Sequence, residues 1–123
     1  MVIDCSVVAA LLFYEPSRDD AAAILKRKEL YAPDLLDHEF VNVAVKKARL
    51  GLGEVTQQAL TDLERLPLAR CRVDPRGQCR LSLELGISAY DAAYLWLAED
   101  LGAPLATFDR RLGLAARRHL GGA

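Results

Sequence analysis

Four short apolar stretches alternate with longer segments in which apolar residues recur every three or four positions. The short stretches predict strands at residues 2–3, 30–32, 68–73 and 104–108, the second of them stopped by Pro33. The longer segments predict helices, whose ends are marked by glycine and proline. These helices are expected at residues 6–13, 17–28, 34–50, 54–66, 75–85, 88–101 and 109–120.

This alternation of strands and helices indicates an α/β fold, because parallel strands joined by helices form a sheet that is covered on both faces. We therefore expect a three-layer α/β/α sandwich with a short parallel sheet of four strands. Segment 68–73 alternates apolar and polar residues, as a strand near a sheet edge does. With 123 residues, 52% of them hydrophobic, residues 1–123 are expected to form a single domain.

Carboxylates stand where an α/β sheet usually binds its ligand. Asp4 follows the first predicted strand and Asp109 follows the last. Asp91 lies in the first turn of helix 88–101, and Glu39 lies in the second turn of helix 34–50. Because ligands bind beyond the carboxyl ends of parallel strands, we expect these four side chains to face the same edge of the sheet.

Helix capping is the competing interpretation for three of these residues. Asp4 and Asp109 can each be a plain N-cap, and Ser88-Ala-Tyr-Asp91 has the pattern of a capping box in which Asp91 bonds back to the Ser88 amide. Glu39 lies past the capping positions among apolar neighbours. Capping therefore does not explain Glu39.

Converging carboxylates repel one another, by roughly 1 kcal/mol for a pair about 4 Å apart in water and by several times that in a sheltered site. A bound cation would relieve this repulsion. Oxygen ligands without matching His or Cys pairs favour Mg²⁺ or Mn²⁺ over Zn²⁺. Such ions bind phosphate oxygens, which points to phosphodiester chemistry by one ion or two.

Four motifs together resemble the PIN-domain family, in particular its VapC-type toxins. They are V-I-D-C-S at 2–6, D-H-E-F-V-N-V around Glu39, S-A-Y-D-A-A-Y-L-W-L-A at 88–98 and A-T-F-D-R-R-L at 106–112. The resemblance covers essentially the whole chain, in order and at the expected separations. Family members often add a strand after the last helix, whereas this chain ends His119-Leu-Gly-Gly-Ala. A fifth strand therefore stays open.

The resemblance implies a Mg²⁺- or Mn²⁺-dependent endoribonuclease that hydrolyses RNA by metal-activated water. It also implies a homodimer and a small co-encoded, VapB-like antitoxin as partners. The family's metal ligands carry over onto Asp4, Glu39, Asp91 and Asp109. Two hydroxyls, those of Ser6 and Thr107, match supporting positions that can orient a carboxylate or a metal-bound water.

Basic side chains crowd the last predicted helix, while the formal net charge of −1 excludes binding of nucleic acid by bulk charge alone. Arg110 and Arg111 are the candidates for holding RNA phosphates or an acidic tail of the antitoxin. The alternative is a solvated helix face. Tyr90 is expected to pack in the core, although its place beside Asp91 also suits stacking on a base.

Two other functions compete with nuclease activity. A non-catalytic, PIN-like module that binds RNA or protein is the main alternative, and the complete acidic set argues against it. A phosphoryl-accepting receiver domain would need paired acids after the first strand and a lysine after the last. Asp4 is followed by Cys5 and Ser6, and Asp109 by arginines, so we discard the receiver.

Location, cysteine chemistry and assembly follow from weaker signals. The chain starts directly with Met-Val-Ile-Asp, without a basic leader or a long apolar segment, so we expect a cytoplasmic protein and no membrane insertion. Cys5, Cys71 and Cys79 lack the spacing of a zinc site, and a disulfide between the last two stays open. The apolar run 7–12 suggests a surface beyond one monomer's core. The sequence does not name the RNA.

Overall fold

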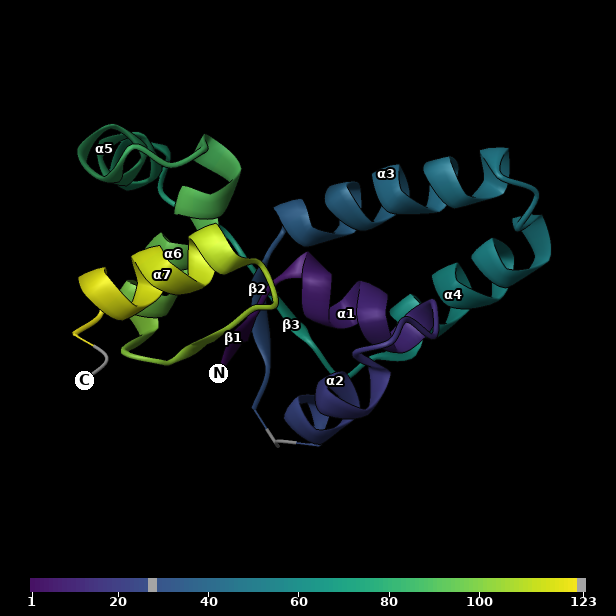
Figure 1. The fold of residues 1–123 in the computed structure, drawn as a ribbon. Helices are drawn as coiled ribbons and strands as arrows, with labels where there is room; N and C mark the ends of the chain where they lie inside the picture. The colour runs from purple at the N-terminus through teal and green to yellow at the C-terminus, as the bar shows by residue number, and fades with distance from the viewer. Residues whose placement is uncertain (27–28, 122–123) are drawn as a thin grey trace.

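The computed structural model describes residues 1–26 and 29–121. Strands and helices alternate along the chain as predicted (Figure 1). The strands are β1 (Val2–Ile3), β2 (Tyr31–Pro33), β3 (Ala69–Cys71) and β4 (Leu105–Ala106). The helices are α1 (Cys5–Leu12), α2 (Arg18–Leu25), α3 (Leu35–Arg49), α4 (Gly53–Arg65), α5 (Pro75–Leu85), α6 (Ala89–Leu101) and α7 (Arg110–His119).

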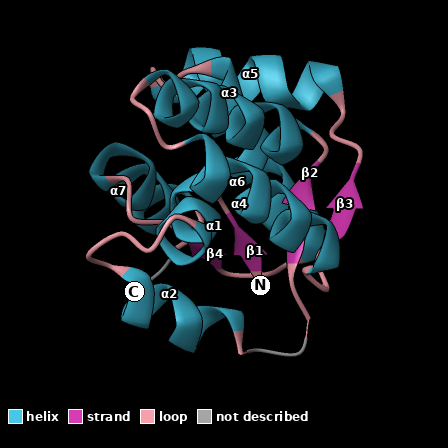
Figure 2. Ribbon diagram, turned by 90° about the vertical axis from the view of Figure 1, so that its right-hand side faces the viewer, coloured by secondary structure: helices cyan, strands magenta, loops and turns pink. Residues whose placement is uncertain are grey.

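The strands form one parallel, four-stranded sheet in the order β3-β2-β1-β4 (Figure 2). Val2 lies opposite both Tyr31 and Leu105, so the first and last strands of the chain are neighbours. Helices α1 to α4 lie on one side of the sheet and α5 to α7 on the other (Figure 1). The predicted α/β sandwich is confirmed, with β3 at an edge. Within the described residues the sheet has four strands.

The strand boundaries differ from the prediction in ways that hydrogen bonding explains. Pro33 belongs to β2 rather than ending it, because the next ladder bond runs from the Asp34 amide to the Cys71 carbonyl at 3.0 Å, so the missing proline N–H is not needed. Strand β4 ends at Ala106, because the Phe108 amide donates to the Ser6 hydroxyl at 2.9 Å instead of to a strand. The predicted helix 17–28 is α2, and residues 27–28 lie outside the described part of the chain.

Helix α1 lies in the middle of the core rather than at an external surface. Its side chains pack under α2, α3 and α4, and the buried ones are Val7, Val8, Ala9, Ala10 and Leu12. Next to it, the rings of Phe13 and Phe40 stack with their centroids 5.1 Å apart. The suggestion that run 7–12 forms a surface for another subunit is therefore wrong, because the chain's own helices cover it.

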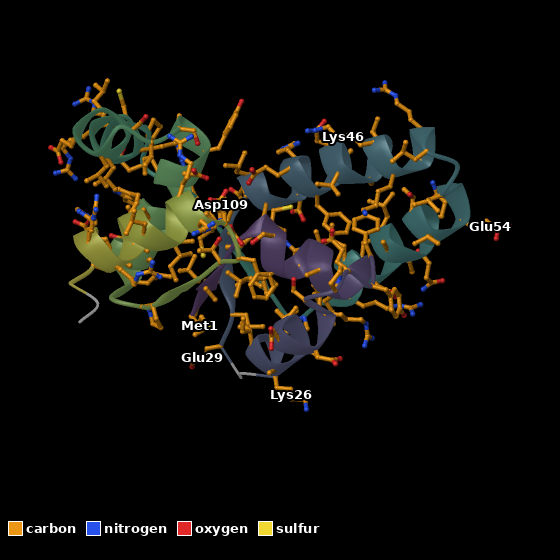
Figure 3. The ribbon with its side chains drawn as sticks, in the orientation of Figure 1. Met1, Lys26, Glu29, Lys46, Glu54 and Asp109 are labelled. Carbon is orange, nitrogen blue, oxygen red and sulfur yellow. The ribbon has the colours of Figure 1, made fainter. Side chains whose placement is uncertain are left out.

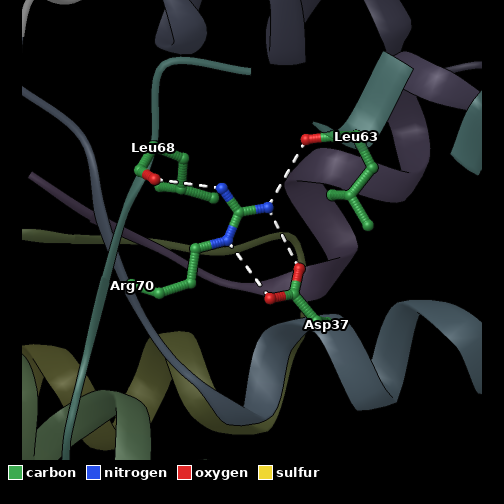
Figure 4. A network of polar contacts seen from close by, with 4 residues as sticks. All are labelled: Asp37, Leu63, Leu68 and Arg70. Carbon is green, nitrogen blue, oxygen red and sulfur yellow. Dashed lines mark hydrogen bonds and ion pairs between the residues drawn. The ribbon is translucent and has the colours of Figure 1, made fainter. Parts of the chain in front are cut away.

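A polar network joins the edge strand β3 to the start of α3 (Figure 4). The Arg70 guanidinium donates to both carboxylate oxygens of Asp37, at 3.2 and 3.0 Å. It also donates to the carbonyls of Leu68 at 3.0 Å and Leu63 at 3.4 Å. This two-pronged ion pair fixes the first turn of α3 against the sheet. Glu39 lies two residues after Asp37 on the same helix.

The structure also describes the cysteines and the apolar character of the helices. Cys5, Cys71 and Cys79 are free thiols, so the disulfide that the sequence left open does not form. In residues 1–26 and 29–121, no helix has both the length and the apolar character needed to cross a bilayer.

Candidate active site

Asp4 is the most tightly held of the predicted site residues. It lies between β1 and α1, and its side chain is 5% exposed. One carboxylate oxygen accepts from the Ser6 hydroxyl at 2.6 Å and the Ser6 amide at 3.1 Å. The other accepts from the Thr107 hydroxyl at 2.6 Å, across 103 residues of sequence. Asp4 is thus an N-cap and also the centre of a long-range network, which capping alone does not require.

The hydroxyls of Ser6 and Thr107 connect the start of α1 to the loop after β4. Their oxygens are 3.5 Å apart. The Ser6 hydroxyl also accepts from the Phe108 amide at 2.9 Å, and the Thr107 hydroxyl accepts from the Asp109 amide at 3.0 Å. Each hydroxyl therefore donates to Asp4 while its own position is fixed by a backbone amide. Both residues predicted to support the site lie directly on its buried carboxylate.

Glu39 receives a hydrogen bond from a residue that the sequence analysis did not include in the site. The Tyr94 hydroxyl, on α6, donates to Glu39 Oε1 at 2.5 Å. Tyr94 is 2% exposed. Burial raises the pKa of Glu39, the bond from Tyr94 opposes this rise, and the charges of Asp4 and Asp91 add to it. A tyrosine in the middle of a buried helix needs a polar partner, and that requirement is the signal that could have drawn attention to Tyr94.

Asp91 and Asp109 lie at the starts of α6 and α7. The Asp91 amide donates to the Ser88 hydroxyl at 3.0 Å, but the hydrogen bonds found in residues 1–26 and 29–121 do not include the reciprocal bond of the predicted capping box. Burial raises the pKa of Asp91, the charge of Asp109 raises it further, and Arg111 lowers it. Asp109 caps α7 by accepting from the Arg111 amide at 2.8 Å. Figure 3 shows Asp109 near the middle of the molecule, at the start of α7.

The four carboxylates are electrostatic neighbours. Asp4 and Asp91 both act on Glu39, and Asp109 acts on Asp91. Burial raises the pKa of Asp4 although its hydrogen bonds oppose the rise. In the part of the chain that the structure describes, no Lys, Arg or His forms an ion pair with any of the four. In the same part, no three His, Cys, Asp or Glu side chains are grouped closely enough to hold one metal ion. The four acids thus lie in one region, but in the described structure they are not arranged as the ligands of a single metal ion.

The thiol beside Asp4 is unsuited to act as a nucleophile. Burial, followed by the charges of Glu39 and Asp4, raises the pKa of Cys5 to about 12. Because the thiolate is the reactive form of a cysteine, this raised pKa disfavours Cys5 as a nucleophile at neutral pH.

Two clefts open beside the carboxylates. The first, the α1–α3 cleft, has a volume of about 590 Å³ and is lined by Cys5, Ser6, Ala9, Glu15, Leu35, His38, Glu39, Asn42, Val43 and Tyr90. The second, the α7 cleft, is also about 590 Å³ and is lined by Thr107, Phe108, Asp109, Arg110, Arg111, Gly113, Leu114 and Arg117. The predicted phosphate-binding residues Arg110 and Arg111 are exposed in the α7 cleft. One cleft is acidic and partly apolar, and the other is basic.

Comparison with known proteins identifies the family. The sequence profile of the PIN domain matches residues 1–118. The chain belongs to the PIN-domain family. This PIN domain is 32% identical over 119 residues to "Ribonuclease VapC3" of Pyrobaculum aerophilum, covering 91% of each chain. It is 31% identical over 121 residues to "Ribonuclease VapC12" of Mycobacterium tuberculosis, covering 91% of this chain and 88% of the relative.

A solved structure has the same fold. The protein PAE2754 from Pyrobaculum aerophilum superimposes on this PIN domain with a TM-score of 0.75. The match covers 99% of this chain and 89% of PAE2754, at 24% sequence identity. At that identity the likeness supports the arrangement of strands and helices and says nothing of activity.

Proposed function

We propose that this PIN domain is a Mg²⁺- or Mn²⁺-dependent endoribonuclease and the toxin of a toxin–antitoxin pair. Asp4, Glu39, Asp91 and Asp109 are proposed as the metal ligands, and Ser6 and Thr107 as the hydroxyls that orient Asp4. The observation that carries the proposal is the buried Asp4 carboxylate, held by two hydroxyls at 2.6 Å each. Relatives that are named ribonucleases, and that match 91% of this chain, support the reaction type.

The electrostatics of the site fit a divalent cation. Burial raises the pKa of Asp4, Glu39 and Asp91, and the charges of neighbouring carboxylates raise the pKa of Glu39 and Asp91 further. In the described residues no cationic side chain forms an ion pair with these three acids. A doubly charged ion would supply the missing positive charge, and oxygen donors suit Mg²⁺ or Mn²⁺. When bound, such an ion supplies the Lewis acid that phosphodiester hydrolysis needs.

The chain's own residues have separate tasks in this proposal. Ser6 and Thr107 fix the direction of both Asp4 oxygens, so that this ligand needs no rearrangement. Tyr94 holds one oxygen of Glu39 and leaves the other available. Arg110 and Arg111, in the α7 cleft, bind phosphates of the RNA backbone. The positive charge of Arg111 lowers the pKa of Asp91, which indicates that the Arg111 guanidinium lies near the carboxylates.

The proposal includes protein partners, namely a second copy of the chain and a small co-encoded antitoxin of the VapB type. A run of exposed apolar side chains on α3, α4 and the turn between them supports a protein-covered surface. These side chains are Val41, Val45, Leu50, Leu52 and Val55.

Removal of the metal tests the reaction. Purified protein incubated with single-stranded and structured RNA is expected to cleave RNA in the presence of Mg²⁺ or Mn²⁺. Excess EDTA should reduce cleavage to background, because the proposed reaction needs the Lewis acid that the divalent ion supplies. Adding back Mn²⁺ after EDTA should restore the rate, which excludes loss of folded protein. Undiminished cleavage in EDTA would reject the metal-dependent mechanism.

A second candidate function, a non-catalytic PIN-like module that binds RNA or protein, is favoured by one observation. Residues 1–26 and 29–121 contain no group of three or more potential ligands already placed for a metal ion. Titration calorimetry separates the two functions. Binding of Mn²⁺ at millimolar concentration or below supports the nuclease, and no measurable binding supports the non-catalytic module.

The affinity for the metal ion is expected to fall as the pH is lowered. The fall should begin at a higher pH than it would for a site made of carboxylates with ordinary pKa values. Burial raises the pKa of Asp4 above 3.8 and that of Glu39 above 4.5, so both bind protons more readily than free acids. A cation must displace these protons, hence its affinity falls as the pH drops through the raised pKa values, by up to about tenfold per pH unit for each proton displaced. Mn²⁺ titrations between pH 4 and 8 would measure this. An affinity independent of pH down to 4 would contradict it.

A further inference from the structure

The α1–α3 cleft combines apolar side chains with a few hydrogen-bonding groups. Helices α1 and α3 run side by side there (Figure 1). Apolar side chains, including Ala9, Leu35 and Val43, form part of the lining. Asn42 and His38 lie one helical turn apart on α3 and add hydrogen-bonding groups to the same cleft. Apolar walls with a few polar groups are typical of small-ligand sites, and about 590 Å³ lies within their usual range.

Tyr90 gives this cleft an available aromatic ring. The sequence predicted that Tyr90 packs in the core, but it is 61% exposed, whereas Tyr94, one turn later on α6, is buried. The prediction failed because the first turn of α6 projects beyond the core. An exposed aromatic ring beside a carboxylate site is a surface on which a nucleobase can stack.

Charge separates this cleft from the α7 cleft. Glu15 and Glu39 line the α1–α3 cleft, and among the described residues its lining includes no lysine or arginine. A phosphate is therefore repelled there and attracted to the arginines of the α7 cleft. Ser6 lines the first cleft and Thr107 the second, and their hydroxyl oxygens are 3.5 Å apart. One lining residue of each cleft thus donates to Asp4.

We propose that the α1–α3 cleft binds an unpaired nucleobase of the RNA strand, next to the phosphate at the carboxylates. Tyr90 stacks on the base, and Asn42 and His38 bond to its edge. This inference rests on the proposed function and deepens it, because it assigns a base-binding subsite to the α1–α3 cleft and names the residues that would contact the base. A base inside a duplex is stacked and paired, so it cannot enter the cleft without being extruded.

Binding measurements with an inactive protein test the inference directly. In the Asp4→Asn background, fluorescence anisotropy would report the affinity for a labelled, unstructured oligoribonucleotide and for a duplex of the same sequence. The single strand is expected to bind more tightly. Adding Tyr90→Ala should weaken single-strand binding by about tenfold, the size of one lost stacking contact. Tyr90→Phe keeps the ring and should retain the affinity.

Tyr14 provides the matched control. It is 68% exposed and is not among the residues that line the cleft, so Tyr14→Ala should leave RNA affinity unchanged. Equal binding of single strand and duplex, or full affinity in Tyr90→Ala, would overturn the inference.

The experiments test the proposed reaction and the base-binding inference independently. If the wild-type protein cleaves RNA with Mn²⁺ and Tyr90→Ala binds single strands at full affinity, only the base-binding inference is wrong. If the wild-type protein does not cleave RNA under any of these conditions, the proposed reaction is wrong. Anisotropy then still decides whether the α1–α3 cleft binds a base.

Discussion

Asp4→Asn is expected to lower the rate of RNA hydrolysis by at least about 100-fold while the protein stays folded. Loss of a residue that merely supports a metal ligand commonly costs 10- to 100-fold, so loss of the proposed central ligand should cost at least as much. Asparagine keeps the shape of the side chain and is a good N-cap, so α1 retains its start. Its amide nitrogen can donate to the Thr107 hydroxyl, which now donates to Asp4 at 2.6 Å.

The same substitution is expected to leave stability unchanged or to increase it. Burial raises the pKa of Asp4 in the folded state above its unfolded value, so the folded protein binds the proton more tightly. The ionised carboxylate therefore lowers stability at neutral pH, and this loss disappears as the pH falls below the raised pKa. Asparagine carries no charge, so the free energy of unfolding at pH 7 should not fall below that of the wild type.

Urea unfolding in EDTA, with cleavage assays on the same preparations, checks both parts. Asp100→Asn is a suitable control, because Asp100 is an exposed carboxylate on α6, away from the site. It should change neither rate nor stability. Wild-type cleavage by Asp4→Asn would remove Asp4 from the mechanism. Slow cleavage together with a large loss of stability would point to a structural role instead.

Gly77→Ala is expected to destabilise the fold by about 2 to 3 kcal/mol, or roughly 10 °C in Tm. Gly77 is buried in α5, where the helix crosses the side chain of Trp96 on α6. A Cβ atom at this position would lie 2.2 Å from Trp96 Nε1 and 2.5 Å from Cδ1. These separations are far below van der Waals contact, so either the indole or the whole of α5 must move.

Gly53→Ala is the matched control, because in the described part of the chain no atom beyond the adjoining residues and the backbone of α4 lies within 4 Å of the Cβ position at the first residue of α4. This change should be neutral or slightly stabilising, since alanine has the higher helix propensity. Thermal unfolding of both variants gives the comparison. Combining Gly77→Ala with Trp96→Phe, which shortens the ring system, should recover part of the loss. Equal Tm values for Gly77→Ala and the wild type would show that the two helices are not packed this closely.

The sequence was sufficient to predict the order of elements and that the four carboxylates lie in one region of the molecule. Asp4 and Asp109 each follow a short apolar stretch, and this local pattern determines which end of a parallel sheet they occupy. The positions of residues relative to the strand ends thus predict which residues approach one another. Glu39 was singled out for a different reason. Capping does not explain a carboxylate among apolar helical neighbours, and burying such a group without a partner lowers the stability of the fold.

The orientation of the site's side chains could not be predicted. The partner of Glu39 is Tyr94, 55 residues later, and no local pattern links them. Whether three carboxylates lie close enough for one ion depends on side-chain torsions, which the spacing of residues along the chain does not determine. Tyr90 was misplaced for a related reason. The apolar residues that follow it on α6 are buried, but the sequence does not show that the first turn of this helix projects beyond the core.

Pairing of β1 with β4 also has a consequence for protein synthesis. The Asp4 pocket closes only when Thr107 reaches it, and Thr107 follows the strand that pairs with β1. A nascent chain has made Asp4, Glu39 and Asp91 well before residue 107 leaves the ribosome, and it folds as it emerges. Until then the buried carboxylate lacks one of its two hydroxyl donors. Any activity that depends on this pocket therefore cannot begin until Thr107 has emerged from the ribosome and β4 has paired with β1.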